Sequence, residues 1–344
     1  MDETMKAVGV YQYLPIDEPK SLVDISLTKP TASGHDLLIK IKAISVNPVD
    51  TKQRAAKERK GKEARTLGWD AAGIITAAGE KVTSFKTGDE VFYAGSVNRP
   101  GCYSEYQLVD ERLVAKKPKT LNFIQAASLP LTSLTASEAL FERLDISHNL
   151  SSNASHKILI INGAGGVGSI AVQLAKSVEL TVIATASRKE TTTWVKELGA
   201  DFVINHRQSF RPQLEKLGIK EVDYILCLHS TDQHWSDMAD VIAPLGKICS
   251  IVENQRPVEL GLLKDKSVTF AWEFMFAKAK YQTADMYTQG ELLSAVATLA
   301  DKGAIRPTMK HNFGKITAEN LRKAHKQLET DTTIGKIVLS GFLE

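Results

Sequence analysis

A glycine-rich turn between two apolar segments organises the middle of the sequence. Residues 158–161 form a short apolar run typical of a strand buried on both faces, and a helical pattern runs from Ser169 to Val178. The turn between them has G-x-G-x-x-G spacing, and a second apolar run follows at residues 181–186. In this motif the glycines allow a tight turn, close approach of a pyrophosphate and close packing of helix on strand. The segment therefore predicts a dinucleotide-binding unit whose loop residues are Gly163, Gly165, Gly166, Val167 and Gly168.

Composition narrows the class of protein. The 344 residues are enough for two cores, and the net charge of +3 gives no sign of a nucleic-acid-binding surface. The basic run from Lys52 to Arg65 is interpreted as a solvated loop or helix face. The three cysteines are scattered, which indicates a reducing compartment, and Cys227 and Cys249 fall in apolar runs expected in the core. We find no membrane span or signal peptide and expect a cytoplasmic protein without a membrane or nucleic-acid partner.

The two ends of the chain differ from its middle. Alternating segments such as residues 36–45 predict half-exposed antiparallel strands in the first third, and Asn47-Pro48 is expected to break that pattern. Strands alternate with helices from about residue 122 to 274, which predicts a parallel sheet. The tail contains helical patterns and a strand at 336–340 that is expected to return to the first domain.

Six motifs in order resemble the medium-chain dehydrogenase/reductase superfamily, in its zinc-free quinone oxidoreductase branch. They are SVNPVD at 45–50, GWDAAG at 68–73, GDEVFYAG at 88–95, SLPLTSLTA at 128–136, NGAGGVGS at 162–169 and IGKIVL at 334–339. The resemblance implies an α/β protein with a GroES-like β domain at 1–126 and 272–344. It also implies a Rossmann domain, a doubly wound parallel sheet that binds the cofactor, at 127–271. Substrate and nicotinamide would meet at the carboxyl ends of the sheet strands.

The positions that carry zinc ligands in other members hold different residues here. Asn47 stands at the first position, Trp69 replaces the histidine of the second motif, and residues 130–134 contain no cysteine. Zinc requires about three nitrogen, sulfur or oxygen ligands from the protein. We therefore expect no metal, and we expect a substrate whose own carbonyl accepts the negative charge.

Candidate site residues in the β domain keep two interpretations each. By resemblance Asn47 lies near the nicotinamide, although an Asn-Pro turn would explain it equally simply. Trp69 is either a core aromatic or a wall of the substrate pocket. Tyr93 is either a proton donor at that pocket or a packed strand residue. Asp50 is expected to pair with Lys52 or to cap a helix. The resemblance also assigns Lys336 to the cofactor site.

The remaining candidates belong to the Rossmann domain. The resemblance places the hydroxyls of Thr132 and Thr135 near the cofactor, although either could be a helix cap. The resemblance also implies that the segment containing Phe274 and Met275 runs beside the nicotinamide. There these residues would form an apolar pocket wall or simply pack between domains.

The end of the second strand of the nucleotide fold predicts the choice of cofactor. NAD enzymes of this fold carry an acid there to bind the ribose hydroxyls, about 20 residues beyond the glycines. Here the strand ends Thr185-Ala186-Ser187-Arg188, without an acid. A serine hydroxyl and a guanidinium suit a phosphate, so Ser187 and Arg188 predict NADPH. The alternative is a solvated loop at Arg188 and Lys189.

Together these features predict an NADPH-dependent reductase of quinones or α,β-unsaturated carbonyls that works without metal. A zinc-type alcohol dehydrogenase and a nucleotide-binding protein with a structural or regulatory role are the alternatives. An edge strand at residues 267–274 is expected to pair two copies into a homodimer.

Overall fold

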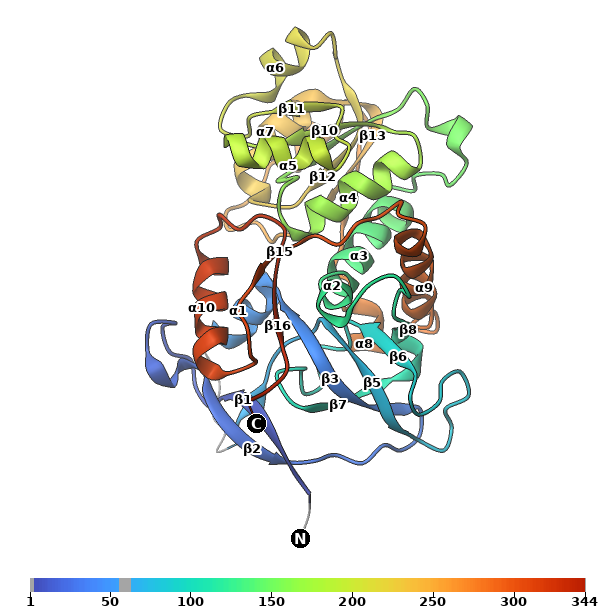
Figure 1. Cartoon of the computed structure of the whole chain (residues 1–344). Helices are drawn as coiled ribbons and strands as arrows, with labels where there is room; N and C mark the ends of the chain where they lie inside the picture. The colour runs from blue at the N-terminus through green and yellow to red at the C-terminus, as the bar shows by residue number, and fades with distance from the viewer. Residues whose placement is uncertain (1–2, 56–62, 344) are drawn as a thin grey trace. The chain divides into compact units, whose positions relative to one another are not determined.

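The chain folds into two compact units (Figure 1). The computed structural model describes residues 3–55 and 63–343. Unit 1 comprises residues 1–131 and 276–344, and unit 2 comprises residues 132–275. The sequence predicted the same discontinuous division with borders at 126/127 and 271/272, a few residues earlier.

Unit 1 is built on antiparallel sheets. The larger has seven strands in the order β15-β16-β3-β5-β6-β8, with β7 paired to β3. Its strands are β3 (Asp36–Val46), β5 (Ala71–Ala78), β6 (Glu90–Tyr93), β7 (Tyr106–Asp110), β8 (Val114–Lys116), β15 (Met309–Asn312) and β16 (Lys336–Ser340). The smaller has three strands, β2 (Val23–Thr28), β1 (Thr4–Val10) and β4 (Arg65–Thr66). The parallel pairing of β15 with β16 is an exception to the antiparallel rule.

The tail of the chain completes this unit, as the sequence predicted. β16 pairs antiparallel with β3, and Ile337 lies opposite Val46. Helix α10 (Ala318–Glu329) lies beside α1 (Pro48–Ala55), two helices from opposite ends of the chain. The other helices of the unit are α2 (Phe123–Ala127), α8 (Ala277–Tyr281) and α9 (Thr288–Asp301).

Unit 2 contains a parallel six-stranded sheet in the order β11-β10-β9-β12-β13-β14. The strands are β9 (Lys157–Ile161), β10 (Thr181–Thr185), β11 (Phe202–Ile204), β12 (Val222–Cys227), β13 (Ile242–Ser250) and β14 (Thr269–Trp272). The helices are α3 (Pro130–Ser137, which begins in unit 1), α4 (Gly166–Ser177), α5 (Lys189–Glu197), α6 (Phe210–Lys216) and α7 (Thr231–Val241). This is the doubly wound Rossmann arrangement that the alternating pattern predicted.

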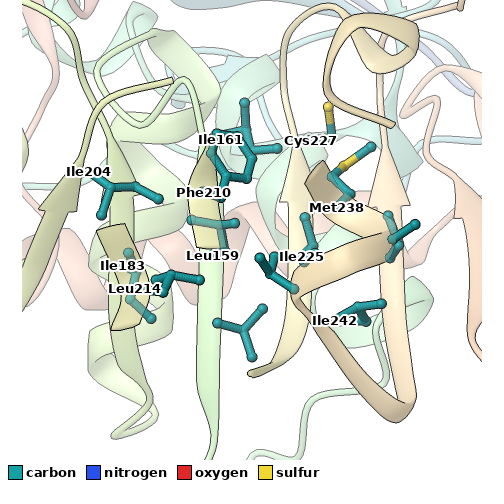
Figure 2. Close-up of a cluster of buried hydrophobic side chains, with 14 of the residues drawn as sticks. Leu159, Ile161, Ile183, Ile204, Phe210, Leu214, Ile225, Cys227, Met238 and Ile242 are labelled. Atoms are coloured by element: carbon teal, nitrogen blue, oxygen red, sulfur yellow. The ribbon is translucent and has the colours of Figure 1, made fainter. Parts of the chain in front are cut away.

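Apolar side chains from the sheet and from α6 and α7 form a core on one face of unit 2 (Figure 2). Leu159, Ile183 and Ile225 come from neighbouring strands, and Phe210 and Met238 from the two helices. All five side chains are buried. Cys227 and Cys249 are also fully buried, as expected. This core fixes the strands whose carboxyl ends carry the glycine loop.

Local structure agrees with the sequence patterns at some points and differs at others. Asn47-Pro48 breaks the strand pattern as expected, and residues 48–55 form helix α1, because proline suits the first helical position and the Asp50 carboxylate accepts the Asn47 N–H at 2.9 Å. Residues 138–143 form a π-helical turn directly after α3. Arg54, within the run expected to be solvated, is buried and contacts Glu329; positions 56–62 of that run lie outside the described residues. Within the described ranges, no helix is long and apolar enough to cross a bilayer.

Candidate functional site

The glycine loop lies at the carboxyl end of β9 and leads into α4. Gly165 is the residue before the helix, and Gly166 and Val167 are its first two residues, all partly exposed. The first backbone N–H groups of a helix lack partners within it and carry the positive end of its dipole. The loop therefore lies at a helix N-terminus, the place where the motif predicts phosphate binding.

Two of the glycines are required by close packing. A Cβ on Gly168 would lie 2.4 Å from the Asn162 carbonyl oxygen, which confirms the tight helix–turn contact. A Cβ on Gly163 would lie 2.9 Å from Ala184 on the neighbouring strand. The left-handed backbone of the turn belongs to Asn162, with φ of 64°, and not to Gly163. The predicted reason for Gly163 was therefore wrong, because close approach and not turn conformation demands glycine there.

The segment after β10 carries the predicted phosphate-reading residues beside this loop. The Thr185 hydroxyl accepts the Asn162 N–H at 2.9 Å, which ties the end of β10 to the start of the glycine loop. Ser187 is half-buried, and Arg188 is exposed at the start of α5. Arg188 also caps that helix, since its N–H donates to the Thr191 hydroxyl at 3.1 Å. The two side chains are thus presented at the sheet edge that carries the glycine loop.

The other predicted residues of unit 2 differ in exposure. Thr132 and Thr135 lie on α3 and are buried, 2% and 5% exposed. Phe274 is 48% exposed just after β14, while Met275 is buried. Phe274 is therefore the side chain of this pair that is available as an apolar wall.

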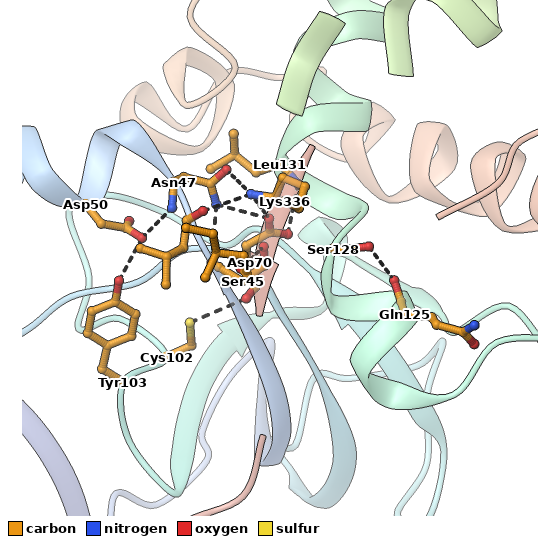
Figure 3. A network of polar contacts seen from close by, with 12 residues as sticks. Ser45, Asn47, Asp50, Asp70, Cys102, Tyr103, Gln125, Ser128, Leu131 and Lys336 are labelled. Carbon is orange, nitrogen blue, oxygen red and sulfur yellow. Dashed lines mark hydrogen bonds and ion pairs between the residues drawn. The ribbon is translucent and has the colours of Figure 1, made fainter. Parts of the chain in front are cut away.

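A buried polar cluster in unit 1 brings together residues from distant parts of the chain (Figure 3). The Lys336 ammonium lies 3.2 Å from the Asp70 carboxylate, donates to the Val46 carbonyl oxygen at 3.1 Å and donates to the Asn47 Oδ1. The Asn47 amide nitrogen donates to the same carboxylate at 3.0 Å. The Leu131 N–H donates to the other Asp70 oxygen at 3.2 Å. Each of the three side chains thus holds the other two.

Burial and charge oppose each other in this cluster. Asp70 is fully buried and Lys336 is 3% exposed. Burial raises the pKa of Asp70 and lowers the pKa of Lys336, and their mutual attraction opposes both shifts. The short ion pair, together with its additional hydrogen bonds, favours the charged form of both groups.

A second buried chain of hydrogen bonds supports the segment that carries Asn47. The Tyr103 hydroxyl lies 2.8 Å from the Asp50 Oδ2 and 3.1 Å from the His325 Nε2. Burial raises the pKa of Asp50 to about 7 and lowers the pKa of His325 to about 3. Asp50 caps the helix after Asn47, as one of its two interpretations predicted, and does not pair with Lys52.

The two aromatic candidates of unit 1 are packed inside it. Trp69 is fully buried, donates its indole N–H to the Ser96 carbonyl oxygen at 2.8 Å and packs edge-on against Phe276. Tyr93 is fully buried, and its hydroxyl donates to the Gln107 side chain at 2.8 Å. Burial raises the pKa of Tyr93 well above its ordinary value. This geometry contradicts a role for Tyr93 as proton donor, because its proton is already donated inside the sheet, and it favours a core role for Trp69.

The residues at the zinc-ligand positions do not fit a zinc ion. The Trp69 indole has no free lone pair and its N–H is already bonded, and the Asn47 oxygen accepts from Lys336. The Cys102 thiol is buried, which raises its pKa well above the ordinary value. Across residues 3–55 and 63–343, no group of three or more His, Cys, Asp or Glu side chains is placed to hold a metal ion.

Comparison with known proteins agrees with this architecture. Residues 33–119 match the alcohol dehydrogenase GroES-like domain, and residues 198–339 match the zinc-binding dehydrogenase domain. The mouse quinone oxidoreductase is 32% identical over 345 aligned residues, covering 97% of each chain. This chain belongs to the medium-chain dehydrogenase/reductase superfamily, in its quinone oxidoreductase-like branch. It is an oxidoreductase of that family.

Other family members carry zinc in their names. A zinc-type alcohol dehydrogenase-like protein from Staphylococcus aureus is 46% identical over 336 residues, covering 98% of this chain and all of the relative. The crystal structure of a putative zinc-dependent alcohol dehydrogenase from Rhizobium etli superposes with a TM-score of 0.95 at 46% identity, covering all of both chains. Although those names refer to zinc, the side chains at the zinc-ligand positions of this chain do not fit that metal, as described above.

Sequence reasoning missed part of the cluster around Asn47. Asp70 was quoted only as part of the GWDAAG motif, and Tyr103 and His325 were not singled out. The sequence signals that could have pointed to this ion pair were the place of Asp70 in the GWDAAG motif and the place of Lys336 in the IGKIVL motif. The pairing of Tyr103 with His325 joins residues 222 positions apart and leaves no local pattern.

Proposed function

We propose that this protein is an NADPH-dependent reductase that transfers hydride to quinones or α,β-unsaturated carbonyls without a metal ion. The single observation that carries the cofactor choice is the segment after β10. It presents Ser187 and Arg188 beside the glycine loop, with no acid at the strand end. A guanidinium and a hydroxyl suit a phosphate, whereas an acid there would favour an unphosphorylated ribose.

The proposed substrate class is supported by the chemistry of the side chains at the zinc-ligand positions in unit 1. Oxidation of an unactivated alcohol needs a Lewis acid or a positioned general base to take the hydroxyl proton, and the side chains at the zinc-ligand positions do not suit zinc. A quinone or enone carries a carbonyl that accepts the charge of the incoming hydride. The NADPH would supply the hydride, and the protein would supply orientation and exclusion of water.

Within this proposal, Asn47 and Lys336 act by positioning. Their polar atoms are used by one another, by Asp70 and by backbone carbonyls. They therefore hold the start of α1 in one conformation. We also propose that the protein acts in the cytoplasm as a homodimer.

The experiment measures NADPH oxidation with a panel of quinones and enones, in the presence and absence of a chelator. We expect turnover that a chelator leaves unchanged and well under one zinc per chain. Tight NADPH binding without turnover on any of these substrates would favour the nucleotide-binding alternative. Stoichiometric zinc whose removal abolishes activity would favour the alcohol dehydrogenase alternative.

Cofactor choice is tested with Arg188→Ala. Hydrogen bonds to charged groups contribute about 1.5–3 kcal/mol each, so this variant should bind NADPH roughly ten- to a hundredfold more weakly and NADH almost unchanged. Lys216→Ala, an exposed substitution on α6, is the matched control. Equal affinities for both cofactors in the wild type, or equal losses in Arg188→Ala, would contradict the proposal.

A further inference from the structure

Three histidines gather near the carboxyl ends of β11 and β12. The rings of His206 and His234 lie 6.4 Å apart in an edge-on arrangement, and His234 stacks on Phe210. His229 follows β12 and lies 2.8 Å from the hydroxyl of Ser230, a residue with left-handed backbone. This cluster lies outside the residues assigned above to the cofactor.

His206 is adjacent to the predicted phosphate-reading segment. Thr185 of β10 and Ile204 of β11 are register partners, and the Ala186 N–H continues the pairing with the Ile204 carbonyl oxygen at 2.9 Å. Ser187 and His206 therefore occupy equivalent positions, two residues beyond the ends of neighbouring parallel strands. The His206 Nδ1 lies 3.2 Å from the Thr185 Oγ1, the same oxygen that accepts the Asn162 N–H.

This contact is compatible with the tautomer of neutral His206 that is protonated on Nε2. The Thr185 hydroxyl accepts the Asn162 N–H and can donate its own proton to the imidazole Nδ1. His206 is half-buried, and the Thr185 oxygen that its Nδ1 contacts also accepts the N–H of Asn162 at the start of the glycine loop.

The surroundings keep His206 neutral in the free protein. Burial lowers its pKa, and Arg207 on its own segment and His229 beyond β12 lower it further. His234 on α7 is buried, which lowers its pKa to about 4, with His206 and His229 adding to the shift. Thr185 faces His206 from β10 and is uncharged. A doubly charged phosphate beside His206 would reverse this balance, because an opposite charge favours the protonated ring.

We propose that His206 is a specificity residue for the 2′-phosphate of NADPH and takes up a proton when that phosphate binds. This inference rests on the proposed NADPH preference and extends it, since attraction by Arg188 alone would not weaken as the pH rises through neutrality. By linkage, the dissociation constant for NADPH should rise with pH, by up to about tenfold per unit between the free and bound titration ranges of His206. NADH should show no such slope.

Whether NADPH binding takes up or releases protons distinguishes recognition by His206 from simple attraction of the phosphate dianion. A phosphate monoester has a second pKa of about 6, so a site that only attracts the dianion causes proton release on binding. Calorimetry in two buffers of different ionisation enthalpy at pH 7 should instead show net proton uptake with NADPH and none with NADH. His206→Gln should remove that uptake, and should weaken NADPH binding about tenfold at pH 6.5 but less than about threefold at pH 8.5. His311→Gln, in unit 1, is the matched control and should change neither quantity.

A second measurement uses the wild-type protein and needs no folded variant. With labelled histidine, titration with adenosine 2′,5′-bisphosphate should raise the pH at which one imidazole signal titrates, and adenosine 5′-monophosphate should not. NADPH preference without proton uptake and without this shift would refute the role of His206 alone. NADPH binding no tighter than NADH would refute both this inference and the proposed cofactor choice.

Discussion

Removing the Lys336 ammonium should destabilise unit 1 through the charge that it leaves behind. In Lys336→Met the Asp70 carboxylate stays fully buried and still accepts hydrogen bonds from the Asn47 amide and the Leu131 N–H. Breaking a buried ion pair from one side costs about 3–5 kcal/mol, which is the loss in unfolding free energy that we expect. Lys323→Met breaks an exposed pair with Glu319 and should cost no more than about 0.5 kcal/mol.

A double-mutant cycle separates charge from lost packing. Asp70→Asn combined with Lys336→Met removes both charges and keeps an oxygen that can accept the two remaining N–H groups. The double variant should therefore recover most of the stability lost in Lys336→Met, and urea unfolding with hydrogen exchange of β3 and β16 amides measures this. Since burial raises the folded-state pKa of Asp70, Lys336→Met should also regain stability as the pH falls through that raised value. Equal losses in the single and double variants, with no gain at lower pH, would refute the electrostatic reasoning.

Two further outcomes follow from the geometry of unit 2. Gly168→Ala places a methyl group 2.4 Å from a backbone oxygen, so it should cost about 1–3 kcal/mol in stability and weaken NADPH binding. The control Gly261→Ala, with 3.8 Å to its nearest neighbour, should be nearly neutral. Calorimetry and cofactor titration distinguish the two variants, and a neutral Gly168→Ala would be the contrary result. If β14 pairs two copies, light scattering at micromolar concentration should give twice the 37.7 kDa chain mass. Trp272→Lys should halve the measured mass because charge on an edge strand opposes pairing, whereas the exposed control Tyr281→Lys should leave it unchanged. A wild-type monomer would be incompatible with the pairing.

The sequence anticipated the features that depend on local patterns. The alternation in residues 36–45 became β3, and the apolar run at 158–161 with its glycines became β9 and the loop before α4. Other features depend on partners that are distant in sequence. Helix α6, which contains Pro212, was not predicted, because its contacts with α7 form only in the folded protein and are not visible in the local sequence.

The candidate site divides in the same way. Ser187 and Arg188 were predicted from their distance to the glycines, which the strand geometry fixes. For Tyr93, β propensity favoured strand packing, but it did not decide whether the side chain faces core or pocket, because that depends on neighbours that β6 acquires only in the folded sheet. The role of Lys336 was likewise hidden, since its partners are the Val46 carbonyl of β3, Asn47, and Asp70 directly before β5.

The pairing of β16 with β3 has a consequence for biosynthesis. The Lys336–Val46 contact spans 290 positions, whereas every strand of unit 2 lies within residues 157–272. On the ribosome, unit 2 can fold while one edge of β3 is still unpaired and Asp70 still lacks its cation. Domains generally fold as units during synthesis, and exposed strand edges promote aggregation. Completion of the sheet of unit 1 is therefore the late step in folding and the one most exposed to aggregation. We expect chaperones to act on this chain at that step.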